Sequence, residues 1–307
     1  MKKKHFIFPG QGSQSVGMLP SIIDTEIAKE YFSKTNSAIG YNLIDICNNG
    51  PEEILTQTKN TQPAIFTLSI IIDSILKDNN IEPISVAGHS LGEYSALVSN
   101  EVLSFEDALD LIIIRSTEME KANTITKGSM AAVLNADDEE LEKIINGVDG
   151  VLVVANYNTT SQVVISGEKK SILDAVEFSK ELSPKIKCIE LNVSGAFHSP
   201  LMKFAREVLS NAINVLNFND ASVPIYQNIN AKPTKDADTI KKNLISQLES
   251  PVQWFQTINH MIENSEQKLF IECGPGNVLK GLNRRISRDI STISVNNIND
   301  IESVRIL

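Results

Sequence analysis

The 307-residue chain has little of what disulfide frameworks, metal sites and membrane spans are made from. Its three cysteines, Cys47, Cys188 and Cys273, are scattered and form no Cys-x-x-Cys pair, so we expect reduced thiols in a cytoplasmic protein. The four histidines include no His-Glu-x-x-His pair, and we therefore expect no metal. The apolar stretch at 65–76 is interrupted by polar residues and cannot span a membrane.

Positive charge is also in short supply. Lysine and arginine number 28 against 38 aspartates and glutamates, which gives a net charge of −10. This balance argues against nucleic-acid or anionic-membrane partners. With 42% hydrophobic and 21% charged residues, the composition is typical of a folded globular protein, and the length suits two domains.

In the first third of the chain, short apolar runs that end in glycine-rich turns alternate with helical patterns. The runs at 5–8 and 84–87 predict buried strands, and apolar residues recur at helical spacing within 65–76 and 108–114. Strand, turn and helix in alternation indicate an α/β fold with a parallel sheet.

The pattern changes between residues 126 and 197. Strand-like and helical stretches follow one another there in the order βαββαβ, which is the order of a ferredoxin-like unit. We therefore predict an α/β protein with two domains. A large α/β-hydrolase-like domain with a parallel sheet comprises residues 1–125 and 198–307, and a small ferredoxin-like domain is inserted at 126–197.

The strongest local signal is a G-x-S-x-G motif at residues 88–92, between a predicted strand and a predicted helix. This context is typical of a nucleophile elbow, in which a tight turn exposes the serine hydroxyl. Ser90 is therefore the candidate nucleophile. The helix that begins there directs free N–H groups toward it. A glycine- and serine-rich turn without chemistry is the alternative interpretation.

A serine nucleophile needs a base, and His198 is the best-placed histidine. It lies in a glycine- and proline-containing loop where the predicted small domain returns to the large one, and sites often lie in clefts between domains. We expect His5 and His260 to be structural. His89 adjoins the nucleophile, so we expect its side chain to point away from that of Ser90, with a place in the pocket lining left open.

Two backbone N–H groups are needed to stabilise an oxyanion. One is expected from Leu91, directly after the nucleophile, and a second from the glycine-rich turn at 10–12. Arg115 lies on an otherwise apolar helix face and needs an anionic partner, because an unpaired buried charge is expensive. That partner is either an acidic side chain of the protein or a carboxylate of the substrate.

Taken together, these segments resemble the malonyl-CoA:acyl carrier protein transacylases of bacterial fatty acid synthesis and the related acyltransferase domains of polyketide synthases. The resemblance extends from Phe6 to about Ile286. It rests on six segments in the family's order, which are 8–14, 88–96, Arg115, 195–199, 251–254 and 274–276.

The resemblance implies a ping-pong transfer of malonyl from malonyl-CoA, the substrate, to the phosphopantetheine thiol of acyl carrier protein. Coenzyme A is the product, and no cofactor is bound permanently. Ser90 forms the malonyl ester and His198 acts as its base. In this family a backbone carbonyl orients the base, and the segment that holds Gln253 matches the one that provides it.

The resemblance also implies roles around the pocket. Arg115 matches the arginine that pairs with the malonyl carboxylate, and the N–H groups of Gln11 and Leu91 match the oxyanion donors. Phe197 resembles the malonyl-selective version of its motif, and Met119 is expected to line the same pocket.

The implied partner is acyl carrier protein, which is acidic in this family. A basic helix is either its docking surface or a solvated helix face, and its charged residues are Lys280, Arg284, Arg285 and Arg288. We expect a monomer, with no nucleic-acid or membrane partner.

Three other functions stay open at the level of sequence. A serine thioesterase or other hydrolase uses the same elbow with water as the acceptor. A trans-acting acyltransferase of a polyketide synthase uses identical chemistry. A non-catalytic carrier-binding protein is the third.

Asn156 and Asn158 lie where relatives place polar groups near the pantetheine arm, and we assign them no role.

Overall fold

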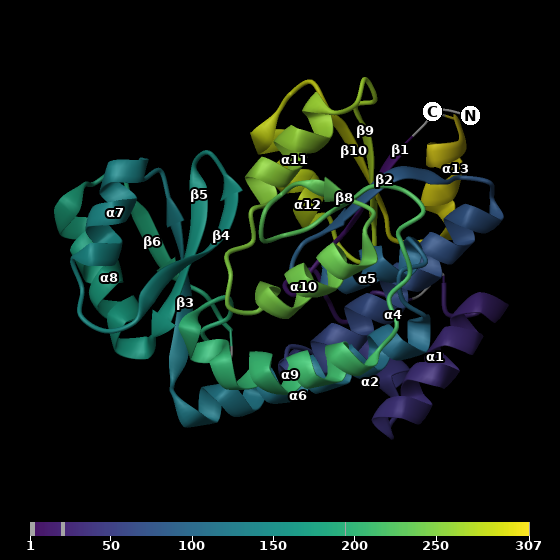
Figure 1. Cartoon of the computed structure of the whole chain (residues 1–307), viewed down its shortest axis with the longest axis horizontal. Coiled ribbons are helices and arrows are strands. Elements are labelled where there is room, and N and C mark those ends of the chain that lie inside the picture. The colour runs from purple at the N-terminus through teal and green to yellow at the C-terminus, as the bar shows by residue number, and fades with distance from the viewer. Residues whose placement is uncertain (1–3, 20–21, 194, 307) are drawn as a thin grey trace.

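The structure, a computed structural model, describes residues 4–19, 22–193 and 195–306. Two sheets organise these residues (Figure 1). The larger sheet has six strands, in the spatial order β10 (Ser291–Val295), β9 (Leu269–Cys273), β1 (Lys4–Phe8), β2 (Pro83–Gly88), β7 (Ile225–Tyr226) and β8 (Pro233–Thr234). All its neighbouring pairs are parallel except β7 and β8.

The central strand β1 shows why this sheet is covered on both faces. All five of its residues are buried. Phe6 and Phe8 belong to one hydrophobic cluster and Ile7 belongs to another, because successive side chains point to opposite faces of a strand. A parallel sheet buried on both faces is the arrangement predicted from the short, continuous apolar runs.

Most helices share the hydrophobic cluster of Phe6 and Phe8. These helices are α1 (Glu26–Ile39), α2 (Leu43–Asn49), α3 (Glu52–Leu55), α4 (Thr58–Asp78), α5 (Gly92–Ser99), α6 (Phe105–Ile125), α9 (Lys203–Val215), α10 (Ala237–Gln247) and α13 (Ile298–Ile306), with a 3-10 turn, η1 (Pro200–Met202), before α9. Two further helices, α11 (Trp254–Glu263) and α12 (Val278–Ile286), pack with Ile7 on the other cluster. No helix in the described ranges is long and apolar enough to cross a membrane.

The small domain has the predicted βαββαβ order. Its elements are β3 (Gly128–Leu134), α7 (Asp138–Asn146), β4 (Leu152–Thr159), β5 (Gln162–Glu168), α8 (Lys169–Leu182) and β6 (Lys187–Glu190). The strands form an antiparallel sheet in the order β4-β5-β3-β6, and both helices contribute to its own hydrophobic cluster. The α/β fold with a ferredoxin-like unit is confirmed, while the domain boundaries at 125/126 and 197/198 stay predictions.

A backbone bridge joins the small sheet to the large domain. Val252 forms a parallel bridge with Asn156 of β4, through bonds of 2.9 Å from the Tyr157 N–H and 2.8 Å to the Ala155 carbonyl. Strands β1, β2, β7 and β9 run parallel, so their carboxyl ends meet at one edge of the large sheet. Ligands of open α/β sheets bind at this edge.

Candidate active site

Ser90 lies in a sharp turn between β2 and α5. Its φ of +50° falls in the left-handed region, which residues other than glycine rarely adopt. The turn is tight because Gly88 and Gly92 meet without room for a side chain: a Cβ on Gly88 would lie 1.9 Å from the carbonyl carbon of Gly92. A backbone strained in this way costs about 1–3 kcal/mol and is characteristic of functional sites. The geometry is that of a nucleophile elbow.

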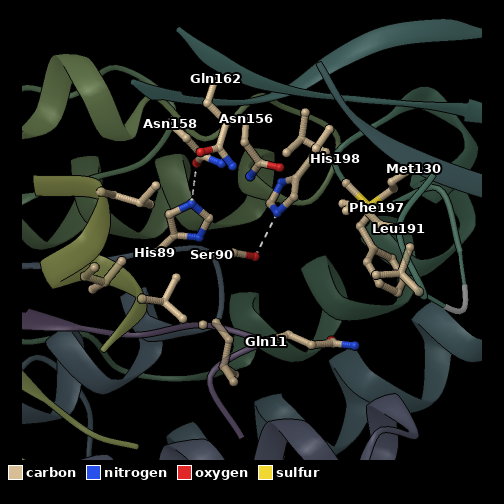
Figure 2. Close-up of a pocket in the computed structure, with 18 of the residues that line it drawn as sticks. Gln11, His89, Ser90, Met130, Asn156, Asn158, Gln162, Leu191, Phe197 and His198 are labelled. Atoms are coloured by element: carbon tan, nitrogen blue, oxygen red, sulfur yellow. Dashed lines mark hydrogen bonds between the residues drawn. The ribbon is translucent and has the colours of Figure 1, made fainter. Parts of the chain in front are cut away.

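The turn brings the Ser90 hydroxyl to His198, as Figure 2 shows, with Oγ 2.7 Å from Nε2 of the imidazole. His198 also has a left-handed backbone, with a φ of +57°, and is 3% exposed. Burial, together with the charge of Arg115, lowers the pKa of His198 to about 3. The imidazole is therefore neutral at physiological pH and can accept the hydroxyl proton.

Two backbone carbonyls orient His198. Its Nδ1 lies 3.0 Å from the carbonyl oxygen of Gln247 and 3.0 Å from that of Ser250. Because carbonyl oxygens only accept, Nδ1 carries the proton and Nε2 presents its lone pair to Ser90. The two carbonyls hold the tautomer that an aspartate holds in a Ser-His-Asp triad.

The prediction that Gln253 orients the base is therefore wrong. The N–H of Gln253 donates to the carbonyl of Asn228 at 3.0 Å, and its side chain donates to the carbonyl of Ile229 at 2.5 Å. The orienting carbonyls lie earlier in the chain because α10 ends at Gln247. The Gln247 carbonyl has no partner within the helix, and it accepts both from His198 and from the Ser250 N–H just beyond the helix, the latter at 3.2 Å.

Arg115 brings a positive charge directly to the nucleophile. It is 1% exposed on α6, and its Nη2 donates to Ser90 Oγ at 2.9 Å and to Gln247 Oε1 at 3.4 Å. The guanidinium also lies 5.6 Å from the centre of the Tyr94 ring. Its Nε is buried and donates to no group in the part of the chain that the structure describes. The guanidinium thus keeps donor capacity for an anionic ligand.

Leu91 and Gln11 are the two residues expected to donate to an oxyanion. Both residues line the cavity that contains Ser90, Leu91 as the N-cap of α5 and Gln11 in the turn after β1. Neither N–H has a hydrogen-bond partner within residues 4–19, 22–193 and 195–306, whereas the N–H of Ser90 donates to Asn228 Oδ1 at 2.7 Å. The two free groups have the character that an oxyanion hole requires.

The cavity has a volume of about 240 Å³ and is lined from both domains. Met119 and Phe197 form part of its apolar wall, where the sequence placed them. Met130, Val164 and Leu191 also belong to this wall and were not singled out from the sequence. A small acyl group would therefore be enclosed by apolar side chains next to Ser90.

The small domain also contributes polar side chains to the cavity. Asn156, Asn158 and Gln162 lie on its upper side in Figure 2. Asn158 Oδ1 accepts from His89 Nε2 at 3.0 Å. Burial lowers the pKa of His89, so this ring is neutral and lines the cavity as a polar wall. The place in the pocket lining that was left open for His89 is therefore occupied.

The other two histidines lie outside the cavity lining. His5 Nδ1 lies 2.7 Å from Ser85 Oγ, and burial lowers the pKa of His5 to about 4. His260 Nδ1 lies 2.8 Å from the carbonyl oxygen of Ala231. Among the described residues, no group of three His, Cys, Asp or Glu side chains is arranged to hold a metal ion.

The basic cluster lies next to the cavity. Its members, all exposed on α12 or just after it, are Lys280, Arg284, Arg285 and Arg288. The opposite side of α12 lines the cavity with Leu279 and Leu282. Arg285 Nη1 donates at 3.0 Å to Oε1 of Gln162, which also lines the cavity. The cluster therefore lies beside the lining of the cavity that contains Ser90.

Polar residues that support the site were also missed from the sequence. The carbonyls of Gln247 and Ser250 orient the base, Asn228 bonds to the Ser90 turn, and the buried Glu93 accepts from the N–H of Asn228. Burial raises the pKa of Glu93 to about 7. Glu93 directly follows the G-x-S-x-G motif, and a buried acid so near a nucleophile was a usable signal. Asn228 had none, because β7 has only two residues and gives no readable pattern.

Comparison with known proteins shows which family this chain is similar to. Residues 5–304 match the acyl transferase domain family. Over 306 residues the chain is 41% identical to the malonyl CoA-acyl carrier protein transacylase of Bacillus subtilis (strain 168), covering 98% of this chain and 96% of the relative. The similarity therefore spans both domains.

Solved structures agree with the sequence comparison. The fold is similar to that of an acyl carrier protein S-malonyltransferase from Vibrio cholerae, with a TM-score of 0.93 and 35% identity, covering 99% of this chain and all of the other. It is also similar to a malonyl-transacylase solved in complex with the holo acyl carrier protein of a type II polyketide synthase. That match has a TM-score of 0.93 and 32% identity, over 98% of each chain.

Proposed function

Since the chain belongs to the malonyl CoA-acyl carrier protein transacylases of the acyl transferase domain family, we propose that it works through a malonyl ester of Ser90, with His198 as the base and Arg115 as the partner of the malonyl carboxylate. The overall reaction is transfer of malonyl from malonyl-CoA to acyl carrier protein, and it supplies fatty acid synthesis. The enzyme is an S-malonyltransferase.

One observation carries the mechanism. The Ser90 hydroxyl lies 2.7 Å from a neutral imidazole nitrogen and 2.9 Å from a buried guanidinium nitrogen. A hydrolase of neutral esters has no need of a desolvated cation at its nucleophile, and holding one there is costly. A substrate with a carboxylate at the far end of a short acyl group compensates that cost. Malonyl has such a carboxylate, and acetyl does not.

In the first half-reaction, Ser90 Oγ attacks the carbonyl carbon of the malonyl thioester while its proton passes to His198 Nε2. The two carbonyls at Nδ1 stabilise the imidazolium that forms. The N–H groups of Leu91 and Gln11 donate to the oxyanion, where removal of one donor typically costs about 10²–10³ in rate. The carbon–sulfur bond then breaks, and the thiolate of coenzyme A takes the proton from His198.

In the second half-reaction the roles are repeated with a new thiol. His198 takes the proton of the carrier protein's phosphopantetheine thiol, and the thiolate attacks the ester carbonyl. The oxygen–carbon bond to Ser90 breaks, and the serine oxygen recovers its proton from His198. Only the two thiols and the serine exchange the acyl group. No permanently bound cofactor enters this scheme.

The apolar wall of the cavity limits the size of the acyl group that Ser90 can accept. Phe197 is 7% exposed and Met119 is 2% exposed, so both side chains occupy space close to the nucleophile. We infer that their bulk excludes branched acyl groups. Methylmalonyl-CoA should therefore acylate Ser90 more slowly than malonyl-CoA, and a smaller side chain in place of Phe197 should reduce the difference.

The basic cluster is the proposed docking surface for the acidic carrier protein. The double variant Lys280→Glu and Arg284→Glu should raise the KM for the carrier at low salt and leave kcat unchanged, because exposed charges act mainly on association. Lys29→Glu with Lys34→Glu, on α1, changes the net charge equally and serves as the control. An unchanged KM would reject the docking surface. A rise confined to malonyl-CoA would instead assign the cluster to the phosphates of coenzyme A.

The experiment that tests the function compares acceptors. With malonyl-CoA alone, release of coenzyme A should stop after one equivalent, and addition of holo carrier protein should restore turnover in a ping-pong pattern. Continuous release without any carrier would identify a hydrolase. A monomeric state and a cytoplasmic location are further predictions, which size-exclusion chromatography with light scattering and cell fractionation would test.

A further inference from the structure

The side chain of Asn228 makes two hydrogen bonds to the backbone of the turn that carries the nucleophile. Its Nδ2 donates to the carbonyl oxygen of Gly88 at 2.6 Å, and its Oδ1 accepts from the N–H of Ser90 at 2.7 Å. The two bonds bracket His89, which lies between these residues in the chain. Asn228 is 2% exposed, so water competes little for either bond.

These bonds continue the ladder between β2 and β7. The parallel pairing of the two strands ends with Ala87 opposite Tyr226. Beyond that pair the backbone turns sharply, and Ser90 has a φ of +50°. The side-chain amide of Asn228 offers one donor group and one acceptor, as a peptide group does, and so takes the place of further backbone pairing.

Asn228 is itself held in one orientation. Its N–H donates to Glu93 Oε2 at 2.8 Å, and its carbonyl accepts from the N–H of Gln253 at 3.0 Å. The other oxygen of Glu93 accepts from Gln227 Nε2 at 3.1 Å, which fixes the carboxylate as well. Both the backbone groups and the side-chain amide of Asn228 are therefore engaged.

We propose that Asn228 is a positioning residue, whose side-chain amide holds Ser90 in the left-handed conformation that points its hydroxyl at His198 and leaves the Leu91 N–H free. The identity of the acyl donor rests on the proposed function, while the activation of Ser90 does not. A serine with positive φ persists only where its surroundings over-determine it. A reacting group misplaced by 1 Å loses about 10²-fold in rate.

The test uses Asn228→Ala, which removes both bonds, and Asn100→Ala as a matched control. Asn100 is fully buried, its Nδ2 donates to the Val223 carbonyl at 2.7 Å, and its Oδ1 accepts from the Val223 N–H at 2.9 Å. It does not line the cavity. Two rates are measured per folded molecule: acylation by malonyl-CoA in a rapid-quench experiment, and labelling by a fluorophosphonate, which reports serine activation whatever the acyl group.

Asn228→Ala should slow both rates by about 10²-fold. Its KM for malonyl-CoA should stay near the wild-type value, because Arg115 and the cavity wall are unchanged. Asn100→Ala should lose a similar amount of thermal stability and keep both rates near wild type. Equal rates in the two variants would overturn the positioning role and leave Asn228 as a structural residue.

Asn228→Asp keeps the shape and the acceptor for the Ser90 N–H but loses the donor to Gly88, and it decides the question if the alanine variant does not fold. Labelling slower than in Asn100→Asp supports the proposal, and labelling at the wild-type rate overturns it. If the wild-type enzyme reacts with the fluorophosphonate but not with malonyl-CoA, the proposed function fails. The fluorophosphonate rates of the variants then decide alone on Asn228.

Discussion

Replacement of Arg115 by methionine should lower the preference of the enzyme for malonyl-CoA over acetyl-CoA. The methionine fills most of the same buried space but removes the charge and the donors to Ser90 Oγ and to a substrate carboxylate. Because Arg115 is 1% exposed, its bond to a carboxylate would be desolvated and charge-assisted, which places it among the strong hydrogen bonds.

The size of the effect follows from that burial. Removing one partner of a buried, hydrogen-bonded charge pair costs about 2–5 kcal/mol. At about 1.4 kcal/mol per factor of ten, a loss of about 3–4 kcal/mol lowers kcat/KM for malonyl-CoA by about 10²–10³. Acetyl-CoA has no carboxylate and loses only the bond from Arg115 to Ser90 Oγ, so its kcat/KM should fall by a clearly smaller factor than that for malonyl-CoA.

The assay measures coenzyme A release in the presence of holo carrier protein, with each acyl-CoA in turn, and reports the ratio of the two kcat/KM values. Arg206→Met is the control, because Arg206 forms an ion pair with Glu249 at 2.5 Å and does not line the cavity. The control should leave the ratio unchanged. An equal loss on malonyl-CoA and acetyl-CoA in Arg115→Met would refute carboxylate recognition and make Arg115 a structural residue.

Three further predictions concern the turn and the base. Gly88→Ala should destabilise the fold by about 1–3 kcal/mol through overpacking, whereas Gly281→Ala, whose Cβ has open space, should not; equal melting temperatures would contradict the tight turn. His198→Ala should slow acylation by about 10²–10⁴, measured by rapid quench, and a normal rate would remove His198 from its role. The depressed pKa of His198, about 3, keeps the imidazole deprotonated as pH falls below 6.5, so kcat/KM should show no acid limb near 6.5. The pH profile is best taken in Glu93→Gln, since the Glu93 pKa of about 7 lies in that window.

The features that could be predicted from the sequence are those with a local signature. The elbow at 88–92 is set by glycines that no other residue can replace, and β1 and β2 are continuous apolar runs. The βαββαβ order could be predicted because each element of the small domain lies next to its neighbours in the chain. Arg115 stood out because a charge on an apolar helix face is rare.

The orientation of the base could not be predicted in this way. It comes from the main-chain carbonyls of Gln247 and Ser250, and every residue has such a carbonyl, so no side chain marks the position. What selects them is the end of α10, and helix ends are uncertain by a few residues when read from sequence. The role was placed on Gln253 through the family resemblance of the segment 251–254, which begins just after Ser250.

The contact between Asn228 and the nucleophile could not be predicted from the sequence either. Asn228 and Ser90 are 138 residues apart and meet only because β7 pairs with β2. Long-range pairing of a two-residue strand leaves no periodicity to read. Polar residues that act through such pairing become visible only when the sheet order is known.

The most direct test of the central claim is intact-protein mass spectrometry after brief incubation with malonyl-CoA. The account predicts one malonyl adduct that maps to Ser90, is absent in Ser90→Ala, and disappears when holo carrier protein is added. An adduct that forms at full yield in Ser90→Ala, or one on Ser90 that the carrier protein cannot discharge, would contradict it.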